Sequence, residues 1–322
     1  MTERTRRDLV RVTVVVTVLN EEATIKFLLD ALIRQTRKSD EIIIVDGGST
    51  DRTVEKIKKY KEIKLLRKSG NRSVGRNYGM SQSKGNIIAF TDAGCIPELN
   101  WLAELIKPFY KKLPSPGQRP ERSENLGEGQ GVRYGRVEVV SGYYKGLSQN
   151  IFEKCLVPYV LVMPDKIPAE FSPSTRSMAM RKGVGLFDEK LSHNEDYAFA
   201  VALRKKGLEF YFAPKAMVGW MPCKNLRQAA WMWLRFAIGD AQAGILRPKV
   251  KLLFLRYYVF FFLFFLNHLF ILISFPYLLW AVAKNYRYVK DLRAFFWLPV
   301  LQLTTDMCVI FGTIMGVLSR SK

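Results

Sequence analysis

The sequence is poor in the residues that build most metal and thiol sites. Its 322 residues include two histidines and four cysteines, and no two cysteines have the CxxC spacing of a zinc or redox motif. This scarcity argues against a structural zinc site and against a disulfide framework. So few and so widely spaced cysteines are typical of a protein from a reducing compartment.

Acidic residues are also scarce relative to basic ones. The chain has 29 Asp and Glu against 50 Lys and Arg, a formal net charge of +21, with 48% hydrophobic residues. The hydrophobic content excludes wholesale disorder, and the positive charge favours anionic partners such as nucleotides or anionic lipid. The basic residues are dispersed and form no stripe interleaved with aromatics, so we expect no nucleic-acid partner.

Two long runs have almost no charge. Tyr257–Ala283 contains no charged residue, and Ala294–Leu318 contains only Asp306. As helices they are as long as, or longer than, the roughly 30 Å of bilayer hydrocarbon. They predict two transmembrane helices that form a hairpin in a multi-pass membrane protein. The alternative is a pair of helices buried in a soluble core.

The apolar runs divide the chain into three predicted regions. Residues 1–225 form a globular domain with a mobile insertion at 113–136, which is rich in Pro, Gly, Glu and Arg. Residues 226–250 form an amphipathic helix whose tryptophans suit the membrane interface. Residues 251–322 hold the hairpin. A basic N-terminus followed by an apolar strand, without a cleavage site, predicts that the large domain is cytoplasmic.

Short β-branched runs alternate with segments of helical periodicity in the large domain. The runs predict strands at Val10–Leu19, Glu41–Val45, Ile63–Leu66, Ile87–Phe90, Val137–Val140 and Leu208–Phe212. Helices are predicted at Glu21–Gln35, Asp51–Tyr60, Ser73–Ser83, Asn100–Lys112, Gln149–Val162 and Glu195–Lys206. This alternation predicts an α/β fold with a mostly parallel, Rossmann-like sheet and Val137–Val140 at its edge.

Acidic and amide side chains follow three of these strands. Asn20-Glu21, Asp46 and Asp92 each come just after a buried run. In a parallel sheet such strand ends converge on one edge, where ligands bind. Carboxylates there can accept hydrogen bonds from a base or a ribose, or hold a divalent metal, while Arg72 and Arg76 suit phosphate oxygens.

The sequence resembles glycosyltransferase family 2, whose members are inverting enzymes with a GT-A fold. The resemblance covers roughly Val10 to Gly244. It rests on VTVVVTVLNEEATI, IIIVDGGSTDRT, GNRSVGRNYGMSQSKGNIIAFTDAGCIP, STRSMAMRK, GLFDEKLSHNEDYAFAVALRKKGLEFYFAP and WLRFAIGDAQAG, in that order. It implies a nucleotide-sugar-binding catalytic domain of a membrane-anchored polysaccharide or lipid-linked glycan enzyme.

The resemblance also implies roles for individual residues. Asp196 would be the general base, with Glu195 as its partner in the family's ED motif. The implied donor-binding residues are Asn20, Glu22, Asp46, Arg76 and Asp92. Contacts with the acceptor or the diphosphate are expected of Arg176, Arg235 and Asp240, although the last two are equally well explained as surface charges of an interfacial helix.

One position departs from the family pattern. The metal-binding DXD motif usually ends in a second aspartate, and here the stretch is Asp92-Ala93-Gly94. Binding of Mg²⁺ or Mn²⁺ would then depend on Asp92, the diphosphate and waters as ligands. The alternative is that arginines replace the metal.

These features predict an inverting glycosyltransferase at the cytoplasmic face of the cell membrane. It would transfer a sugar from a nucleotide-sugar donor to a lipid-linked or growing glycan acceptor. Two alternatives stay open: a polyprenyl-phosphate sugar synthase, and a catalytically inactive nucleotide-binding membrane scaffold, which the missing aspartate suggests.

Overall fold

The computed structural model of the chain describes residues 10–110, 137–168, 170–266 and 270–320. The chain divides into two compact units, Met1–Lys145 with Pro164–Trp220, and Gly146–Met163 with Met221–Lys322. The second unit thus includes a segment that the sequence analysis assigns to the N-terminal domain. The predicted insertion at 113–136 lies outside the described residues.

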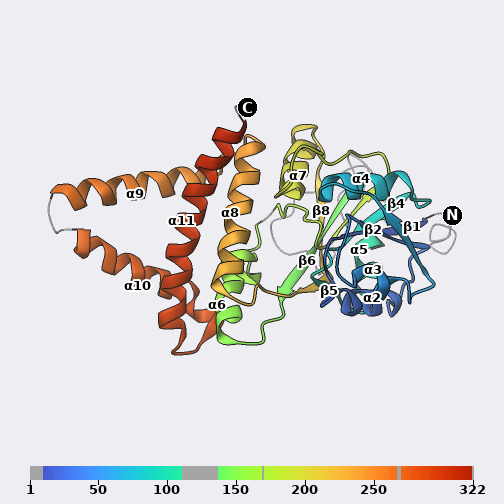
Figure 1. Ribbon diagram of the computed structural model, residues 1–322, viewed down its shortest axis with the longest axis horizontal. Coiled ribbons are helices and arrows are strands. Elements are labelled where there is room, and N and C mark those ends of the chain that lie inside the picture. Colours follow the sequence, from blue (N-terminus) through green and yellow to red (C-terminus); the bar gives the residue numbers. More distant parts are fainter. Residues whose placement is uncertain (1–9, 111–136, 169, 267–269, 321–322) are drawn as a thin grey trace, which may run out of the picture. The chain divides into compact units, whose positions relative to one another are not determined.

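The first unit is built on one eight-stranded sheet (Figure 1). Its strands are β1 (Val12–Val18), β2 (Glu41–Asp46), β3 (Ile63–Arg67), β4 (Ile87–Phe90), β5 (Cys95–Pro97), β6 (Val139–Gly146), β7 (Met178–Arg181) and β8 (Phe210–Trp220). Their order across the sheet is β3-β2-β1-β4-β7-β6-β8-β5. The first unit is an α/β domain, as predicted.

The sheet is mixed, so the expectation of a mostly parallel sheet is wrong in its second half. β1 pairs in parallel with β2 and β4, and β2 with β3. β7 is antiparallel to both β4 and β6, and β5 is antiparallel to β8. β6 lies inside the sheet between β7 and β8, not at an edge, because its first six residues are all buried. Strand–helix alternation therefore describes only β1 to β4.

Helices cover the sheet on two faces (Figure 1). They are α2 (Ile25–Ile33), α3 (Thr53–Ile57), α4 (Arg72–Ser81), α5 (Trp101–Ile106) and α7 (Glu195–Lys205), with short 3-10 helices at Lys107–Phe109 and Pro164–Lys166. α4 and α7 pack on one face, where Met80 and Phe199 join Val15, Ile43 and Phe90 in one hydrophobic core. α2 lies on the opposite face and buries Leu28 and Leu29.

The register of the parallel strands places the predicted polar residues at one edge. Val18 pairs with Asp46 across β1 and β2, and Val15 pairs with Phe90 across β1 and β4. Asn20 and Asp92 each come two residues after those paired positions. The carboxyl ends of β1, β2 and β4 thus bring Asn20, Asp46 and Asp92 to the same end of the sheet, as the sequence predicts.

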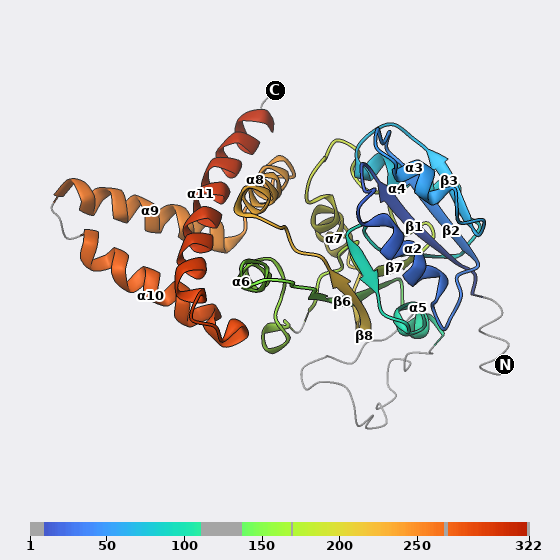
Figure 2. The same cartoon turned by 60° about the horizontal axis from the view of Figure 1, so that its bottom comes forward.

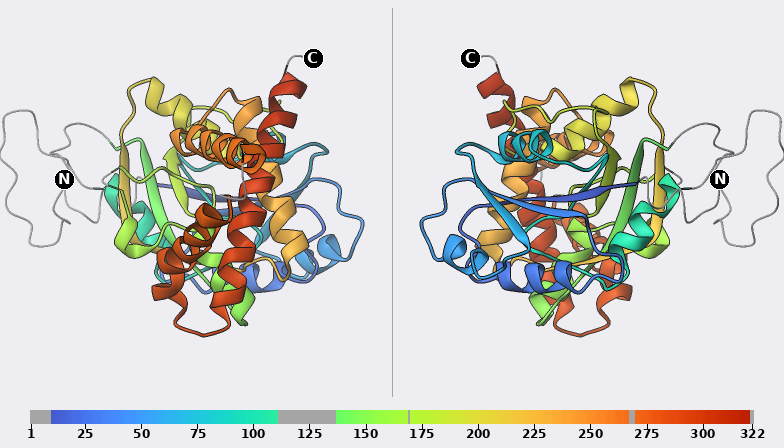
Figure 3. Two further views of the ribbon diagram at one scale, coloured as in Figure 1. Left: turned by 90° about the vertical axis from the view of Figure 1, so that its left-hand side faces the viewer. Right: turned by 90° about the vertical axis from the view of Figure 1, so that its right-hand side faces the viewer.

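The second unit is helical. It contains α6 (Ile151–Val160), α8 (Leu226–Gln242), α9 (Pro248–Leu266), α10 (Phe270–Val289) and α11 (Ala294–Arg320). α8 and α11 lie side by side, and α6 packs against α10 and α11 (Figure 2). A hydrophobic core unites Phe152, Trp233, Val282 and Leu298 from four of these helices. The turn between α10 and α11 is at the bottom of both views in Figure 3.

The predicted first membrane span is divided between two helices. α9 ends at Leu266 and α10 begins at Phe270, so no single described helix covers 257–283. The uncharged parts of α9 and α10 are about 15 and 21 Å long at about 1.5 Å per residue, less than the hydrocarbon thickness. Among the described residues, α11 is the one helix long and apolar enough to cross a membrane. The predicted pair of spans is therefore not found.

Candidate active site

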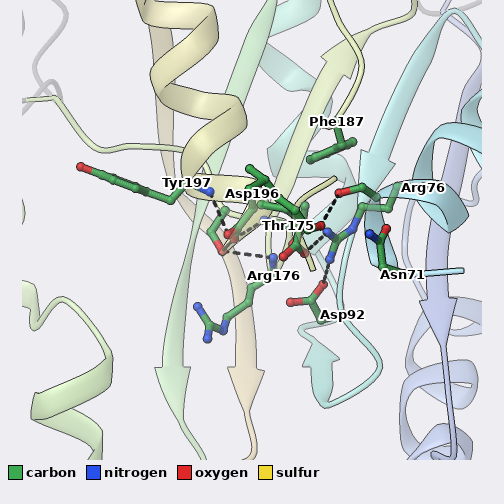
Figure 4. A network of polar contacts seen from close by, with 12 residues as sticks. Asn71, Arg76, Asp92, Thr175, Arg176, Phe187, Asp196 and Tyr197 are labelled. Carbon is green, nitrogen blue, oxygen red and sulfur yellow. Dashed lines mark hydrogen bonds and ion pairs between the residues drawn. The ribbon is translucent and has the colours of Figure 1, made fainter. Parts of the chain in front are cut away.

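The centre of the site is a buried arginine that bridges two carboxylates (Figure 4). Arg76 on α4 is 3% exposed, and its Nη2 lies 3.1 Å from Oδ1 of Asp92, just after β4. Its Nη1 contacts Oε1 of Glu195 at the start of α7, and Glu195 is also 3% exposed. The guanidinium lies over the ring of Phe187, 5.3 Å from the centroid. The structure therefore brings together three residues that the sequence analysis selects.

Asp92 is held in its charged form. Burial opposes its ionisation, but the charges of Arg76, Arg176 and Arg72 and a hydrogen bond with Thr175 outweigh burial, so the pKa of Asp92 lies below its ordinary value. The side chain keeps 34% exposure, which leaves it open to a ligand. At neutral pH Asp92 is therefore an anionic hydrogen-bond acceptor at the sheet edge.

The Asp196 carboxylate has hydrogen bonds to both oxygens. Ser174 Oγ donates to its Oδ2 at 2.7 Å, and the Tyr197 backbone N–H donates to its Oδ1 at 2.8 Å. The Thr175 N–H makes a longer contact of 3.4 Å with Oδ2. Thr175 therefore contacts both of the predicted functional carboxylates, Asp92 and Asp196.

Local backbone geometry sets where Asp196 points. Asn194, immediately before α7, adopts left-handed φ of 55°, a conformation that asparagine tolerates better than most residues. This turn starts α7 at Glu195, so that both acids fall in its first turn. Negative charge is favoured at a helix N-terminus by the backbone dipoles.

α4 fixes the loop that leads to α7. Asn71 Nδ2 donates to the Glu189 carbonyl at 2.7 Å, and Asn77 Nδ2 donates to the Phe187 carbonyl at 2.9 Å. Ser73 Oγ donates to the Leu191 carbonyl at 3.3 Å. Three polar side chains of one helix thus satisfy backbone groups of the segment before the ED pair.

Three of the predicted donor-binding residues bond the loop after β2. Asn20 Oδ1 accepts from the Thr50 N–H at 2.9 Å, and Glu22 Oε2 accepts from the Arg52 N–H at 3.0 Å. Asp46 Oδ1 accepts from the Ser49 N–H at 3.0 Å. Asp46 is 1% exposed, and its Oδ2 is buried without a hydrogen bond among the described residues. Nε of the exposed Arg67 lies 3.5 Å from Oδ2 and forms an ion pair rather than a hydrogen bond, so a ligand donor can still hydrogen-bond to this oxygen.

Arg176 is held by aromatic rings. Its guanidinium lies 5.6 Å from the ring centroids of both Tyr144 and Trp220. In Figure 4 it points away from the Arg76 bridge. Guanidinium stacking on ring faces leaves the in-plane N–H groups directed outward, where they can bind an anion.

Arg235 and Asp240 are on α8 in the second unit. Arg235 lies over the Trp231 ring, 5.8 Å from its centroid, and Asp240 makes a bidentate pair with Arg247 at 2.7 and 3.1 Å. Their suggested contacts with acceptor or diphosphate stay predictions.

Two residues of the site are not among those predicted from the sequence. Ser174 and Thr175 contact Asp196, and their signal was their position directly before Arg176 in the same motif. Glu21, which the sequence places with Asn20 at the end of the first strand, is close enough to the site for Arg72 and Asp92 to act on its charge. Burial raises the pKa of Glu21 above its ordinary value, although a hydrogen bond from Thr24 opposes the shift.

The metal donors at this edge are few. Among the described residues no group of three or more His, Cys, Asp or Glu side chains is arranged to hold an ion. At Gly94 an added Cβ would meet nothing within 4 Å, so the position where the family pattern has an aspartate is open space. A divalent cation would find one protein carboxylate, Asp92, and would need the rest of its ligands from a bound diphosphate and water.

A family model and several known proteins are similar to parts of this chain. The model of the family "Glycosyl transferase family 2" matches residues 13–156. The chain is 31% identical over 109 residues to the glycosyltransferase GlyA of Streptococcus pneumoniae, covering 32% of this chain and 15% of that protein. It is 34% identical over 99 residues to the glycosyltransferase AglE of Haloferax volcanii, covering 28% and 33%. The chain thus spans a third or less of these relatives.

A solved structure extends the likeness in fold to nearly the whole chain. The mannosyltransferase PcManGT from Pyrobaculum calidifontis, in complex with GDP-Man and Mn²⁺, superposes with a TM-score of 0.58. The alignment covers 97% of this chain and 88% of that one at 18% identity. The likeness shows a shared fold, the GT-A arrangement with its mixed sheet.

Proposed function

Because the chain belongs to glycosyl transferase family 2 through the domain at residues 13–156, we propose that it is an inverting glycosyltransferase that uses a nucleotide-sugar donor. One observation carries the proposal. Thr175 contacts both Asp92, just after β4, and Asp196, at the start of α7. This shared contact supports a site in which Asp92 acts on the donor and Asp196 acts on the acceptor.

The donor's nucleoside binds at the carboxyl ends of β1 and β2. Asp46 Oδ2, buried and without a hydrogen bond among the described residues, accepts from a base N–H or a ribose hydroxyl. Asn20 and Glu22 act on the same ligand, in part by shaping the loop at 47–52 that they bond. Asp92 lies beside the ribose and the diphosphate.

Transfer then needs one proton acceptor and one stabilised leaving group. The acceptor hydroxyl oxygen attacks the anomeric carbon while its proton passes to the Asp196 carboxylate. The bond from that carbon to the diphosphate oxygen breaks, and its electron pair leaves with the nucleoside diphosphate. A positioned base of this kind contributes roughly 10²–10⁴ in rate. Attack from the opposite face inverts the anomeric centre.

Positive charge must compensate the departing diphosphate. A divalent cation held by Asp92 and the diphosphate would supply part of it, by neutralising developing negative charge. Arg176 and Arg72 supply fixed positive charge close enough to lower the pKa of Asp92. Glu195 keeps Arg76 charged and buried at the same site.

The acceptor is a lipid-linked or growing glycan at the cytoplasmic face of the membrane. The second unit supports this placement through large apolar side chains that face outward: Phe261, Phe262 and Phe264 on α9 are 64%, 55% and 56% exposed, and Phe311 on α11 is 58% exposed. Such a surface suits a lipid bilayer better than water. Free cysteines throughout the described chain agree with a reducing compartment.

A donor screen tests the function. Purified full-length protein in detergent is given a panel of nucleotide sugars, with thermal shift as the binding readout and release of nucleoside diphosphate as the turnover readout. We expect one donor class to raise the melting temperature and to be consumed when acceptor lipid extract is added. Donor binding without turnover in any extract would instead support the inactive scaffold.

A second candidate function is a polyprenyl-phosphate sugar synthase, whose acceptor is a lipid phosphate. Arg176, whose guanidinium lies over the rings of Tyr144 and Trp220, suits an anionic acceptor as well as it suits the leaving diphosphate. Transfer of a ¹⁴C-labelled sugar into lipid, followed by mild acid, separates the two. Release of the labelled monosaccharide by mild acid indicates the phosphate acceptor, and label that stays in a glycosidic bond to another sugar indicates the hydroxyl acceptor.

A further inference from the structure

Arg76 makes more contacts than a nucleotide-binding residue at a sheet edge needs. Its side chain is buried, both of its terminal nitrogens are paired with carboxylates, and its face lies on Phe187. One carboxylate, Asp92, belongs to the donor side, and the other, Glu195, immediately precedes Asp196. Because the side chain is only 3% exposed and both terminal nitrogens already contact carboxylates, a substrate has little access to the guanidinium.

The planar fork of arginine suits this bridge. The two terminal nitrogens are fixed in one rigid plane, so one guanidinium can hold two carboxylates at a set distance, which a lysine ammonium cannot do as a single point charge. A buried charge is tolerated when it is paired on both sides, and removing one partner leaves an uncompensated ion. Glu195 depends on this pairing in particular, since its second oxygen, Oε2, is buried without a hydrogen bond among the described residues.

The segment before Asp196 needs such a fixture. From Lys182 to Asn194 the chain has no helix or strand, so the position of α7 depends on side-chain contacts. α4 provides them through Asn71, Ser73 and Asn77, and the bridge from Arg76 to Glu195 is the last contact in that row before the candidate base.

We propose that Arg76 is a positioning residue, which together with Glu195 sets the distance between Asp92 and Asp196 and does not itself bind the nucleotide. The proposal rests on the function proposed above. It assigns Glu195 the role of anchoring α7 to α4, so that Asp196 faces the anomeric carbon of a donor held beside Asp92.

The test is a double-mutant cycle on the full-length protein. Arg76→Lys, Glu195→Gln and the double variant are compared by calorimetric affinity for the free nucleoside diphosphate and by kcat and KM for transfer. Arg181→Lys and Glu138→Gln are matched controls: Arg181 lies over the Phe109 ring at 5.3 Å and is 3.9 Å from Glu138. This control pair is at the far end of β7, where Arg181 pairs with Ile87, the first residue of β4.

We expect each site variant to lower kcat by about 10²-fold, the effect of misplacing a reacting group by roughly 1 Å. Nucleoside diphosphate affinity should stay within about threefold of wild type, and the double variant should be no slower than the slower single variant, because both break one contact. The control variants should keep wild-type kcat. Glu195→Asp, which keeps the charge but withdraws the carboxylate, should also lower kcat and covers the case in which Arg76→Lys does not fold.

Two results would overturn this proposal and leave the proposed function intact. One is a loss of nucleoside diphosphate affinity above about tenfold in Arg76→Lys that Glu195→Gln does not share, which would mean direct nucleotide contact. The other is multiplicative loss of kcat in the double variant, which would mean independent roles. A wild-type protein that neither binds nucleotide nor turns over any donor would instead overturn the proposed function, and this proposal with it.

Discussion

The Asp196 side chain is fixed before any substrate arrives. Each oxygen of its carboxylate accepts a hydrogen bond, one from Ser174 and one from the Tyr197 backbone, and its neighbour Glu195 is tied to Arg76. A general base gains from this, because a proton acceptor that is already oriented loses little entropy in the transition state. The acceptor hydroxyl must come to Asp196, rather than the reverse.

Replacing Asp196 with asparagine tests the base. The amide is nearly the same size but cannot take the acceptor's proton, so we predict that transfer falls by at least 10²-fold, consistent with the roughly 10²–10⁴ that a general base contributes. Donor affinity should stay within a few-fold, since Asp196 acts on the acceptor. Radiolabelled transfer and calorimetry measure the two effects.

Asp188→Asn is the control for that substitution, because Asp188 is an exposed aspartate of the loop before α7, and its side chain accepts a hydrogen bond from the nearby Lys190 N–H at 2.9 Å. It should leave transfer unchanged. If Asp196→Asn keeps a tenth or more of wild-type turnover, Asp196 is not the base.

Gly94 makes the metal dependence testable. The space beside it is open, so Gly94→Asp can be accommodated without a clash. With one protein carboxylate at the site, we predict that the wild type needs millimolar Mg²⁺ or Mn²⁺, and that Gly94→Asp shifts half-maximal activation to lower metal concentration, because it adds a charged oxygen ligand. Activity is measured against metal concentration for both proteins.

A charge control separates ligation from a general electrostatic effect. Glu98→Gln removes a carboxylate whose partner is the exposed Lys145, and it should leave the metal curve unchanged. Full activity of the wild type in excess EDTA would show that arginines neutralise the diphosphate unaided and would contradict the assignment of a metal to Asp92.

At the scale of elements, the first half of the sheet could be predicted and the second half could not. β1 to β4 are short β-branched runs separated by helices, and local pattern is enough to place them. β5, with the sequence CIP, and β7, with the sequence MAMR, are short and contain no β-branched run that would mark them as strands. Their antiparallel pairing depends on partners far along the chain, such as Cys95 with Trp220, and no local signal encodes it.

The same limit applies to the candidate site. Asn20, Asp46 and Asp92 could be predicted from the ends of the strands, since a polar residue after a buried run is visible in the sequence. The bridge through Arg76 joins residues 119 positions apart, and nothing near Arg76 indicates that it is buried rather than open to a nucleotide. Burial of a charged residue is decided by tertiary pairing, which a single sequence does not display.

Helix packing in the second unit depends on two glycines of α11. A Cβ on Gly312 would lie 2.6 Å from the Leu234 carbonyl oxygen, and one on Gly316 would lie 2.6 Å from the Ile238 carbonyl oxygen. The glycines are four residues apart, as are their contacts on α8, so the two helices run parallel and their backbones approach closely. Small residues at this spacing are the usual basis of close helix pairs in membranes.

Gly316→Val should therefore separate α8 from α11. Its side chain would meet backbone and Ala241 Cβ rather than a movable side-chain end, and such overpacking costs about 1–3 kcal/mol. We predict a lower melting temperature in detergent, measured by intrinsic fluorescence. Met315→Val, at a neighbouring position that is 52% exposed, is the control and should leave the melting temperature unchanged. An equal effect of both variants would mean that the glycine contact is unimportant.

For the whole molecule, the parallel pairing of α8 and α11 restricts how the chain meets a membrane. α8 is predicted to lie flat in the interface, and α11 is predicted to cross the bilayer. The two helices lie side by side and run in the same direction. Gly316 lies beside Ile238, and further along both helices Gln242 Nε2 donates to Ser319 Oγ at 3.1 Å. Either both helices follow the membrane normal or both lie along the surface.

We predict that α11 crosses and that α8 accompanies it. α11 has 27 residues with a mean hydropathy of 1.6 over its most apolar window, and its length of about 40 Å exceeds the hydrocarbon thickness. Two of the three charges of α8 can be carried there because Asp240 is neutralised by Arg247 and Arg235 lies on Trp231, and the third, Arg227, is in the first turn of the helix. The turn before α11 and the end of α11 should then lie on opposite faces of the membrane.

Cysteine labelling in sealed vesicles decides the matter. Leu292→Cys, at a turn position that is 80% exposed, and Ser319→Cys, near the end of α11, are made with Cys223 and Cys308 replaced by serine. A membrane-impermeant maleimide should label one variant directly and the other only after detergent is added. Direct labelling of both would mean that α11 lies along the surface with α8. The prediction that α8 lies in the membrane interface would then be correct, and the prediction that α11 crosses the bilayer would be wrong. Attachment to the bilayer would depend on the exposed aromatic residues of α9.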